Sequence, residues 1–329
     1  MIMRKLLILA LALFSLPAIL AAEPDDTAAL PQDAEDAASD SEDDTLPLDT
    51  IEYDAERIQP VIINGVTARL KVDPSIFGAL LVNPDVASAM KLKPSFLSLR
   101  NRVGPIIIKI NSDRVKVDYG ATIKRRRTLW ADRSVTSKAD GIIGPGALPY
   151  KIIRFRLAPS KAGEHILTFP ISQGGIFSLG AAKTTPIKIG DQEVHVAFNL
   201  DRDDNIATAP VANLIAQQFG GTLTGEPRPA VIVYEVARPV RRLALARPFI
   251  FAGRNVDPLM VRVSDYGDVD PIPDDSKAEA DANEIVVTAK KGQRAYYILY
   301  LGQAYLKGCS LLTYDFEQKQ IRLSCSDQG

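Results

Sequence analysis

The chain has 329 residues, of which 46% are hydrophobic and 24% charged, a balance that is typical of packed globular domains and excludes a wholly disordered protein. Its 39 basic and 40 acidic side chains nearly cancel, so net charge gives no attraction to a polyanion and we expect no nucleic-acid partner. The length is sufficient for two domains.

The N-terminal 22 residues have the pattern of a secretory signal peptide. Two basic side chains precede an apolar run over residues 6–20, and two alanines follow it. We expect cleavage near Ala22, a periplasmic or secreted protein, and no membrane span after cleavage, because the run is short for a bilayer. Residues 23–50 carry eleven acidic and no basic side chains, which predicts a disordered linker.

Residues 51–180 contain the signals of a small β-rich unit. The Asn64-Gly65 step between two alternating apolar runs predicts a β-hairpin. Its second run ends at Asp73, and Pro84 suits the first turn of a helix. The apolar step Ile142-Ile143-Gly144 predicts a later strand.

The same pattern recurs in residues 181–329 and indicates an internal repeat. Here the hairpin turn is Gly190-Asp191 and the proline is Pro210, nineteen residues beyond Asp191, as Pro84 lies nineteen beyond Gly65. Eight residues past the turn, where the first copy has Asp73, the second copy has Asn199. The nearest carboxyl group belongs to Asp201, which shares a strand face with Asn199 if the strand continues that far.

This arrangement resembles the lobes of retropepsin-like and pepsin-like aspartic proteases. In that family each lobe has an apolar hairpin strand that ends in Asp-Thr/Ser-Gly, then a short helix, then an apolar-apolar-Gly strand that braces the catalytic loop. The resemblance implies an all-β, bilobal fold with a few short helices, whose lobes span residues 51–180 and 181–329. It implies that Asp73 is the catalytic acid of the first lobe, but neither lobe has the signature tripeptide.

The chemistry of that family needs two carboxyl groups that share one proton. Asn199 cannot take part in such sharing, and Pro74 stands where the family has a hydroxyl residue. We therefore expect a catalytically degenerate protein whose interlobe cleft binds an extended peptide or protein segment. The alternative is an atypical aspartic endopeptidase in which Asp73 and Asp201 form the pair after a local bulge. A third possibility is a structural envelope protein, and Asp73 as an ordinary loop acid is also open.

The two cysteines flank a predicted terminal hairpin. Residues 311–323 contain interleaved apolar and polar side chains on either side of a turn near residues 317–319. The ends that carry Cys309 and Cys325 should therefore face each other. Because we expect export to an oxidising compartment, we predict a disulfide between them.

Charged segments occur in both lobes. An acidic insertion over residues 265–283 lacks the glycine-centred spacing of a calcium loop, so we interpret it as a solvated loop. The basic clusters at residues 124–127 and 238–247 favour exposed strand faces over a ligand patch. Residues 284–289 resemble the box with which outer-membrane receptors engage an energy-coupling protein, but an ordinary strand is the preferred interpretation.

Other enzyme classes have little support in the sequence. The two histidines, His165 and His195, lie in β-patterned stretches without a nucleophile elbow. Metal-ligand spacings and a phosphate-binding glycine loop are also absent from the sequence. We therefore expect no cofactor and no metal.

Overall fold

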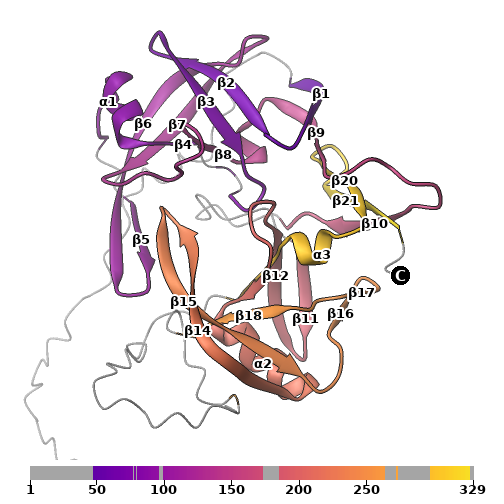
Figure 1. Cartoon of the computed structure of the whole chain (residues 1–329). Coiled ribbons are helices and arrows are strands. Elements are labelled where there is room, and N and C mark those ends of the chain that lie inside the picture. The colour runs from indigo at the N-terminus through magenta and orange to yellow at the C-terminus, as the bar shows by residue number, and fades with distance from the viewer. Residues whose placement is uncertain are drawn as a thin grey trace, which may run out of the picture. The chain divides into compact units, whose positions relative to one another are not determined.

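The computed structural model describes most of the chain beyond the acidic linker. Within this part the strands form three large sheets and one short pair, with three α-helices (Figure 1). The predicted all-β fold class is confirmed. The described residues are 47–76, 78, 80–95, 99–172, 185–263, 272 and 297–326.

The N-terminal sheet closes into a barrel because β2 pairs with both β3 and β6. The predicted turn joins β2 to β3, and Asn64 and Gly65 adopt the positive φ angles of 50° and 78° that a tight hairpin requires. In spatial order the strands are β2 (Ile58–Ile63), β3 (Val66–Val72), β8 (Gly141–Ile143), β4 (Leu80–Val82), β7 (Ile123–Ala131), β6 (Ile106–Asp118) and β5 (Leu99–Val103).

Strand β8 lies between the hairpin and the next strand of the barrel. It runs parallel to β3 and antiparallel to β4, so its residues brace the end of β3. Helix α1 (Pro84–Ala89) begins at the predicted proline, whose missing N–H costs nothing in a first helical turn. A 3₁₀ turn over Pro145–Ala147 follows β8.

The C-terminal sheet uses the same local signals. Its predicted Gly190-Asp191 turn joins the first two strands, and β19 runs parallel to β12 as β8 does to β3. Helix α2 (Ala209–Phe219) has Pro210 in its first turn and ends at Gly220 with a φ of 73°. The strands in order are β11 (Thr185–Ile189), β12 (Gln192–Phe198), β19 (Ile298–Leu301), β13 (Asn205–Ala207), β18 (Leu259–Arg262), β15 (Val236–Leu245) and β14 (Gly221–Val233).

A third sheet combines strands from both ends of the chain. The predicted terminal hairpin forms, but β20 pairs with β9 and β21 pairs with β10, so its strands extend a sheet of the first half. Residues 48–50, which we assigned to the linker, instead begin β1, because β1 pairs along β9. The strands in order are β1 (Leu48–Tyr53), β9 (Tyr150–Arg156), β20 (Cys309–Asp315), β21 (Gln320–Cys325) and β10 (His165–Pro170).

The predicted disulfide is confirmed at the open end of this hairpin. Cys309 and Cys325 are bonded and face each other as cross-strand partners. The remaining elements are the β16 (Ile250–Phe251) and β17 (Arg254–Asn255) pair and the short helix α3 (Gln303–Leu306).

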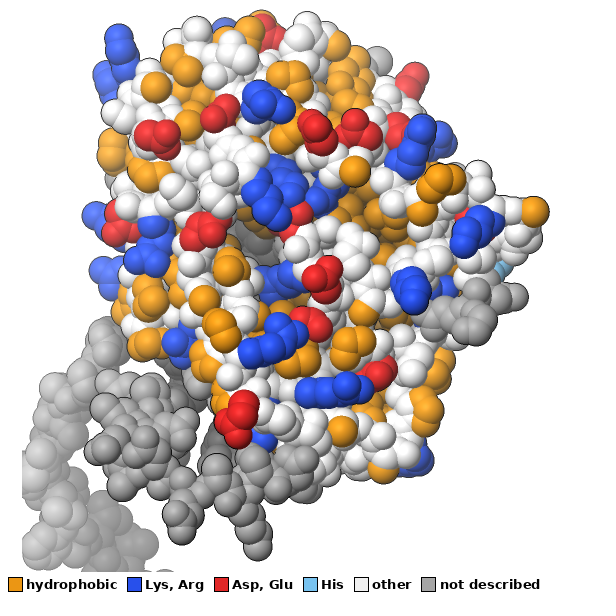
Figure 2. All heavy atoms as spheres, viewed as in Figure 1, with side chains coloured by type: hydrophobic (Ala, Val, Ile, Leu, Met, Phe, Trp, Pro, Cys, Tyr) orange, Lys and Arg blue, Asp and Glu red, His pale blue; other side chains and the backbone are white. Residues whose placement is uncertain are grey.

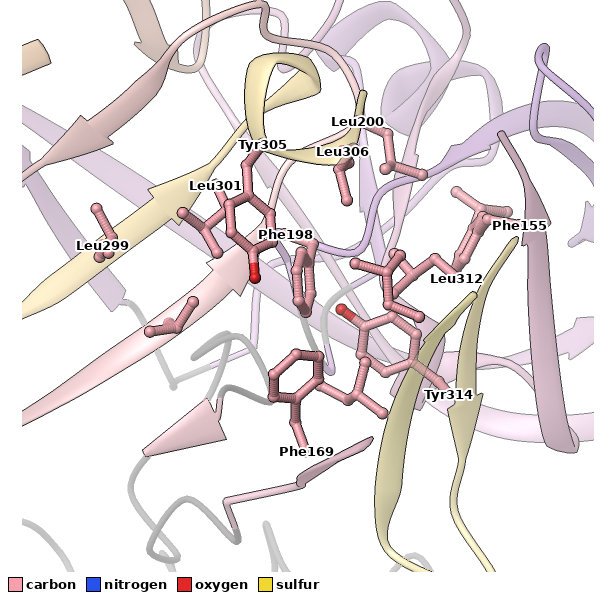
Figure 3. Packing of buried hydrophobic residues seen from close by; sticks show 14 of the residues in the cluster. Phe155, Phe169, Phe198, Leu200, Leu299, Leu301, Tyr305, Leu306, Leu312 and Tyr314 are labelled. Carbon is pink, nitrogen blue, oxygen red and sulfur yellow. The ribbon is translucent and has the colours of Figure 1, made fainter. Parts of the chain in front are cut away.

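Buried aromatic side chains link the shared sheet to the C-terminal sheet. Phe169 of β10 packs against Phe198 of β12 at a ring distance of 5.9 Å, and Phe198 packs against Tyr305 of α3 (Figure 3). Phe155 and Tyr314 contact each other within the shared sheet. Because aromatic side chains bury large areas, this cluster gives the two halves a common core.

Several predictions concern residues outside the described ranges. These are the signal peptide, nearly all of the linker, the 284–289 motif and the acidic insertion apart from residue 272.

Candidate functional site

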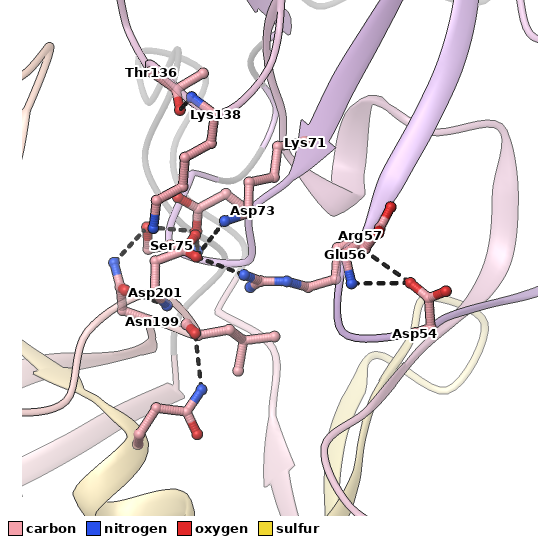
Figure 4. Close-up of polar contacts among 12 residues, drawn as sticks. Asp54, Glu56, Arg57, Lys71, Asp73, Ser75, Thr136, Lys138, Asn199 and Asp201 are labelled. Atoms are coloured by element: carbon pink, nitrogen blue, oxygen red, sulfur yellow. Dashed lines mark hydrogen bonds and ion pairs between the residues drawn. The ribbon is translucent and has the colours of Figure 1, made fainter.

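Asp73 begins the loop that follows β3. Its backbone N–H donates to the carbonyl of Ile143 in β8 at 3.0 Å, so the bracing strand sets where the loop starts. The backbone N–H and the hydroxyl of Ser75 both donate to Asp73 Oδ1, at 2.8 and 2.7 Å (Figure 4). Ser75, one position later than the family pattern, thus supplies the hydroxyl that Pro74 cannot.

Asn199 has the same position relative to its own bracing strand. It follows β12, and its backbone N–H donates to Leu301 of β19 at 2.9 Å. Its side-chain Nδ2 donates to Ser75 Oγ at 3.1 Å, and its Oδ1 accepts the backbone N–H of Asp201 at 3.0 Å (Figure 4). A relay of hydrogen bonds therefore runs from the Asn199 amide through Ser75 to the Asp73 carboxyl.

The strand does not continue as far as Asp201, so Asp201 does not share a strand face with Asn199. Strand β12 ends at Phe198, because the chain turns there and Asn199 caps the turn. The Asp201 carboxyl instead accepts hydrogen bonds from Arg57 Nη2 at 2.6 Å and from Lys71 Nζ. Among the described residues, no hydrogen bond joins it to Asp73.

The cations that hold Asp201 come from the N-terminal half. The side chains of Arg57 and Lys71 are 6% and 10% exposed, and that of Asp201 is 26% exposed. Our sequence analysis missed both cations. Lys71 carried a usable signal, because a lysine two residues before Asp73 in an apolar strand must point to the same face of that strand. Arg57 precedes β2 and carried no such signal.

The two carboxyl groups have opposite electrostatic surroundings. Burial raises the pKa of Asp73, and the nearby charge of Asp201 adds to this, against the hydrogen bonds from Ser75. For Asp201, burial opposes ionisation, but the charges and hydrogen bonds of Arg57 and Lys71 outweigh it and lower the pKa. Asp201 is therefore held as a carboxylate, while Asp73 retains a proton more readily than an exposed aspartate.

Arg202 adds a third cation beside these loops. Its Nη2 donates to the carbonyl of Ile232 at 2.6 Å, and its guanidinium lies 5.7 Å from the ring centre of Tyr300. Burial lowers its pKa, and the charges of Asp73 and Asp201 oppose that effect. The sequence analysis did not identify Arg202.

The side chains at this site differ in whether they can exchange a proton. Asp73 can accept or give a proton, but the Asn199 amide cannot titrate. The Asp201 carboxylate is paired with two cations, Arg57 and Lys71.

The other predicted charged features show ordinary partners. Arg126 donates to the carbonyl of Ala147, Arg241 donates to that of Gly225, and Arg242 pairs with Asp257. On the face shown in Figure 2, basic and acidic side chains are interspersed. Neither observation indicates a patch of one sign. The predicted exposure holds only in part, because Lys124 and Arg241 are buried, at 7% exposure each.

The described residues contain neither a metal-binding cluster nor a membrane-spanning helix. No group of three or more His, Cys, Asp or Glu side chains in this part of the chain is placed to bind a metal ion. None of the helices described is both long and apolar enough to cross a bilayer.

Comparisons with known proteins show likeness in structure rather than in sequence. No family model matches the chain, and no curated protein matches it in sequence. An aspartic proteinase from Irpex lacteus aligns over 82% of this chain and 94% of its own, with 11% identity and a TM-score of 0.39. The all-β assignment rests on the strand pairings of this chain and not on that likeness.

Proposed function

We propose that this chain is an exported aspartic-protease-like protein that has lost the catalytic acid pair and binds an extended peptide or protein segment between its two halves. The observation that carries the proposal is Asn199. It follows β12 as Asp73 follows β3, with the same backbone bond to a bracing strand. An amide at this place leaves one titratable group where the chemistry needs two.

The endopeptidase alternative requires Asp201 to replace Asn199, and two observations disfavour it. The Asp201 carboxyl is occupied by Arg57 and Lys71. If Asp201 turned to share a proton with Asp73, it would leave Arg57 and Lys71 without a counter-ion. Two unpaired buried cations are strongly unfavourable. Asp201 therefore serves as the counter-ion that joins the two halves.

The edge strands of the sheets support the binding role, because an extended segment can bind by adding a strand to such an edge. In the described part of the chain, β5 and β14 each end a sheet, as do β1, β10 and β11. Strand β14 carries Pro227 and Pro229, which have no N–H to offer a new strand, whereas Leu99–Val103 contains no proline. An edge of this kind can pair with an extended backbone. Residues of β5 share an apolar cluster with the tip of the β14–β15 hairpin from the other half, so we place the bound segment alongside β5, where the two halves meet. The Cys309–Cys325 disulfide is consistent with an oxidising compartment.

The catalytic part of the proposal is tested by proteolysis. The full chain is incubated from pH 3 to pH 7 with a reduced and alkylated, hence unfolded, protein, and new termini are counted by mass spectrometry. We expect the wild type and Asp73→Asn to give the same background. Cleavage that is lost in both Asp73→Asn and Asp201→Asn, with both variants folded by circular dichroism, would establish the endopeptidase alternative instead.

The binding part has a separate readout. The same unfolded protein, fluorescently labelled, is titrated with the full chain and followed by anisotropy. We expect saturable binding that the natively folded form of the labelled protein does not compete away. A flat titration would contradict the binding role whatever the result of the proteolysis assay.

A further inference from the structure

The β14–β15 hairpin of the C-terminal sheet reaches a surface of the N-terminal barrel. Its tip residues Tyr234 and Val236 are 3% and 4% exposed. They are buried in one apolar cluster with barrel residues (Figure 1). We call the barrel side of this cluster the tip groove; it consists of Leu81, Val103, Ile108, Ile110, Leu129, Ala131, Val135 and Ile142.

Polar contacts hold the hairpin on both sides of its tip. Glu235 Oε1 accepts the backbone N–H of Ser137 at 2.8 Å, and the carbonyl of Ile232 accepts the bond from Arg202. The tip thus presents an aromatic side chain to the groove and a carboxylate to a backbone donor beside it. Ile76, one residue beyond Ser75, is partly buried in the same cluster, so the groove adjoins the Asp73 loop.

The tip adopts a turn that its residues do not favour. Tyr234 and Glu235 have φ angles of 51° and 54°, and bulky residues are unfavourable there. By contrast, the β2–β3 and β11–β12 hairpins use Asn-Gly and Gly-Asp turns. A shift in pairing register between Val231 and Val233 further weakens the ladder next to the tip. Contact with the groove, rather than local propensity, therefore holds the tip in this conformation.

We propose that the tip groove is a recognition surface for an extended partner segment that carries an aromatic residue followed by an acidic one between β-branched residues. The hairpin tip, Ile232–Val236, is its internal competitor. This inference rests on the proposed binding function and names the chemistry of the bound segment. Displacing the tip uncovers the groove and frees Arg202 from Ile232, so that its guanidinium can donate to a carbonyl of the incoming segment.

The test uses a labelled peptide that contains Ile-Val-Tyr-Glu-Val, with acetylated and amidated ends, titrated with the full chain. The deciding variant is Tyr234→Gly, because it removes the competing side chain while glycine suits the positive φ of the turn. We expect this variant to bind the peptide at least tenfold more tightly than the wild type. Val236→Ser should act in the same direction, and Val231→Ser, at a side chain that is 52% exposed, should match the wild type.

Peptide variants test the recognition chemistry. Replacing the tyrosine by alanine removes the group that fills the groove, and replacing the glutamate by lysine removes the acceptor for the Ser137 N–H. Each should weaken binding to Tyr234→Gly by about tenfold or more. Equal affinity for all three peptides would overturn the proposal, as would equal affinity of Tyr234→Gly, Val236→Ser and the wild type, with folding of each variant verified by circular dichroism.

The unfolded protein used above separates this inference from the proposed function. If it binds the wild type and Tyr234→Gly while the peptide binds neither, the tip-groove proposal fails and the proposed function stands. If the peptide binds Tyr234→Gly and the unfolded protein binds neither variant, the groove proposal stands, and the binding function is restricted to segments of this chemistry.

Discussion

Asp201 shows how a side chain two residues from the expected site can take a different role. Its carboxylate bonds to Arg57 and Lys71, which are nearly buried. Burial disfavours ionisation, yet the two cations give Asp201 a lower pKa in the folded chain than in the unfolded one. The carboxylate therefore stabilises the fold above its unfolded pKa, and this contribution disappears as the pH falls through the folded value.

Asp201→Asn should accordingly destabilise the protein at neutral pH by about 3 kcal/mol, because two buried cations lose their counter-ion. The stability difference between the variant and the wild type should shrink below about pH 4, because the Asp201 carboxyl of the unfolded wild type is protonated there. Urea unfolding at pH 7 and at pH 3.5 measures both values. A difference independent of pH would show that lost packing, and not charge, is responsible.

Asp73→Asn should change the stability at neutral pH in the opposite direction to Asp201→Asn. Burial raises the pKa of Asp73 in the folded chain, so the protonated group stabilises the fold, and that contribution is lost as the pH rises through the folded pKa. Asparagine keeps an Oδ1 that accepts both bonds from Ser75 but carries no charge. We expect the variant to be more stable than the wild type at pH 7 and equal to it below the unfolded pKa. Lower stability at pH 7 would contradict this assignment.

At the level of elements, the bracing strands depend on close backbone approach. A Cβ on Gly141 of β8 would lie 2.2 Å from the carbonyl oxygen of Leu81, and one on Gly302 would lie 2.3 Å from that of Asp204. Real Cβ atoms do not approach backbone so closely. Both strands that position the Asp73 and Asn199 loops thus require glycine at or beside their ends.

Gly141→Ala should therefore cost about 3 kcal/mol of stability or more, since backbone rather than a flexible side chain must move. Gly78→Ala is the matched control, because a Cβ there meets no atom within 4 Å. Urea unfolding of the two variants gives the comparison. Equal stabilities would mean that β8 shifts freely, and the loop positions would then not depend on it.

The terminal hairpin is the second element with a measurable constraint. The disulfide joins residues separated by 16 positions, and closing a loop of that size contributes about 3 kcal/mol. Replacing both cysteines by alanine should lower the unfolding free energy by about this amount. Measurements on the wild type with and without reductant provide the control, and no loss in either experiment would contradict the prediction.

At the scale of the whole molecule, the shared sheet makes the two halves interdependent. Strand β20 pairs with β9, and the aromatic core crosses from β10 to β12 through Phe169 and Phe198. Neither half can unfold without breaking strand pairs or core contacts of the other. This connectivity distinguishes the molecule from two domains on a linker.

Unfolding should therefore be a single cooperative transition. Trp130 is the only tryptophan and lies in β7 of the N-terminal barrel, so its fluorescence reports on that half, whereas far-ultraviolet circular dichroism reports on all strands. The two urea curves should coincide, and Phe169→Leu should shift both together. Separate midpoints would show that the halves unfold independently.

The sequence alone determined the features that obey local rules. Asn64-Gly65 and Gly190-Asp191 specify hairpins because few residues tolerate their backbone angles, and prolines 84 and 210 mark helix starts. The cysteine pair followed from its position at the ends of one hairpin. These signals were sufficient for the all-β class, the disulfide and the positions of Asp73 and Asn199 at the ends of their hairpin strands.

Only the tertiary structure decided what those loops contact. Arg57 lies 144 residues from Asp201, and no local pattern links them, so the commitment of Asp201 to two cations became visible only in the fold. The pairing of β20 with β9 and the burial of Tyr234 in the N-terminal barrel have the same origin. Long-range contacts are selected by total burial and charge pairing over the whole chain, whereas turns and caps are selected by the few residues that form them.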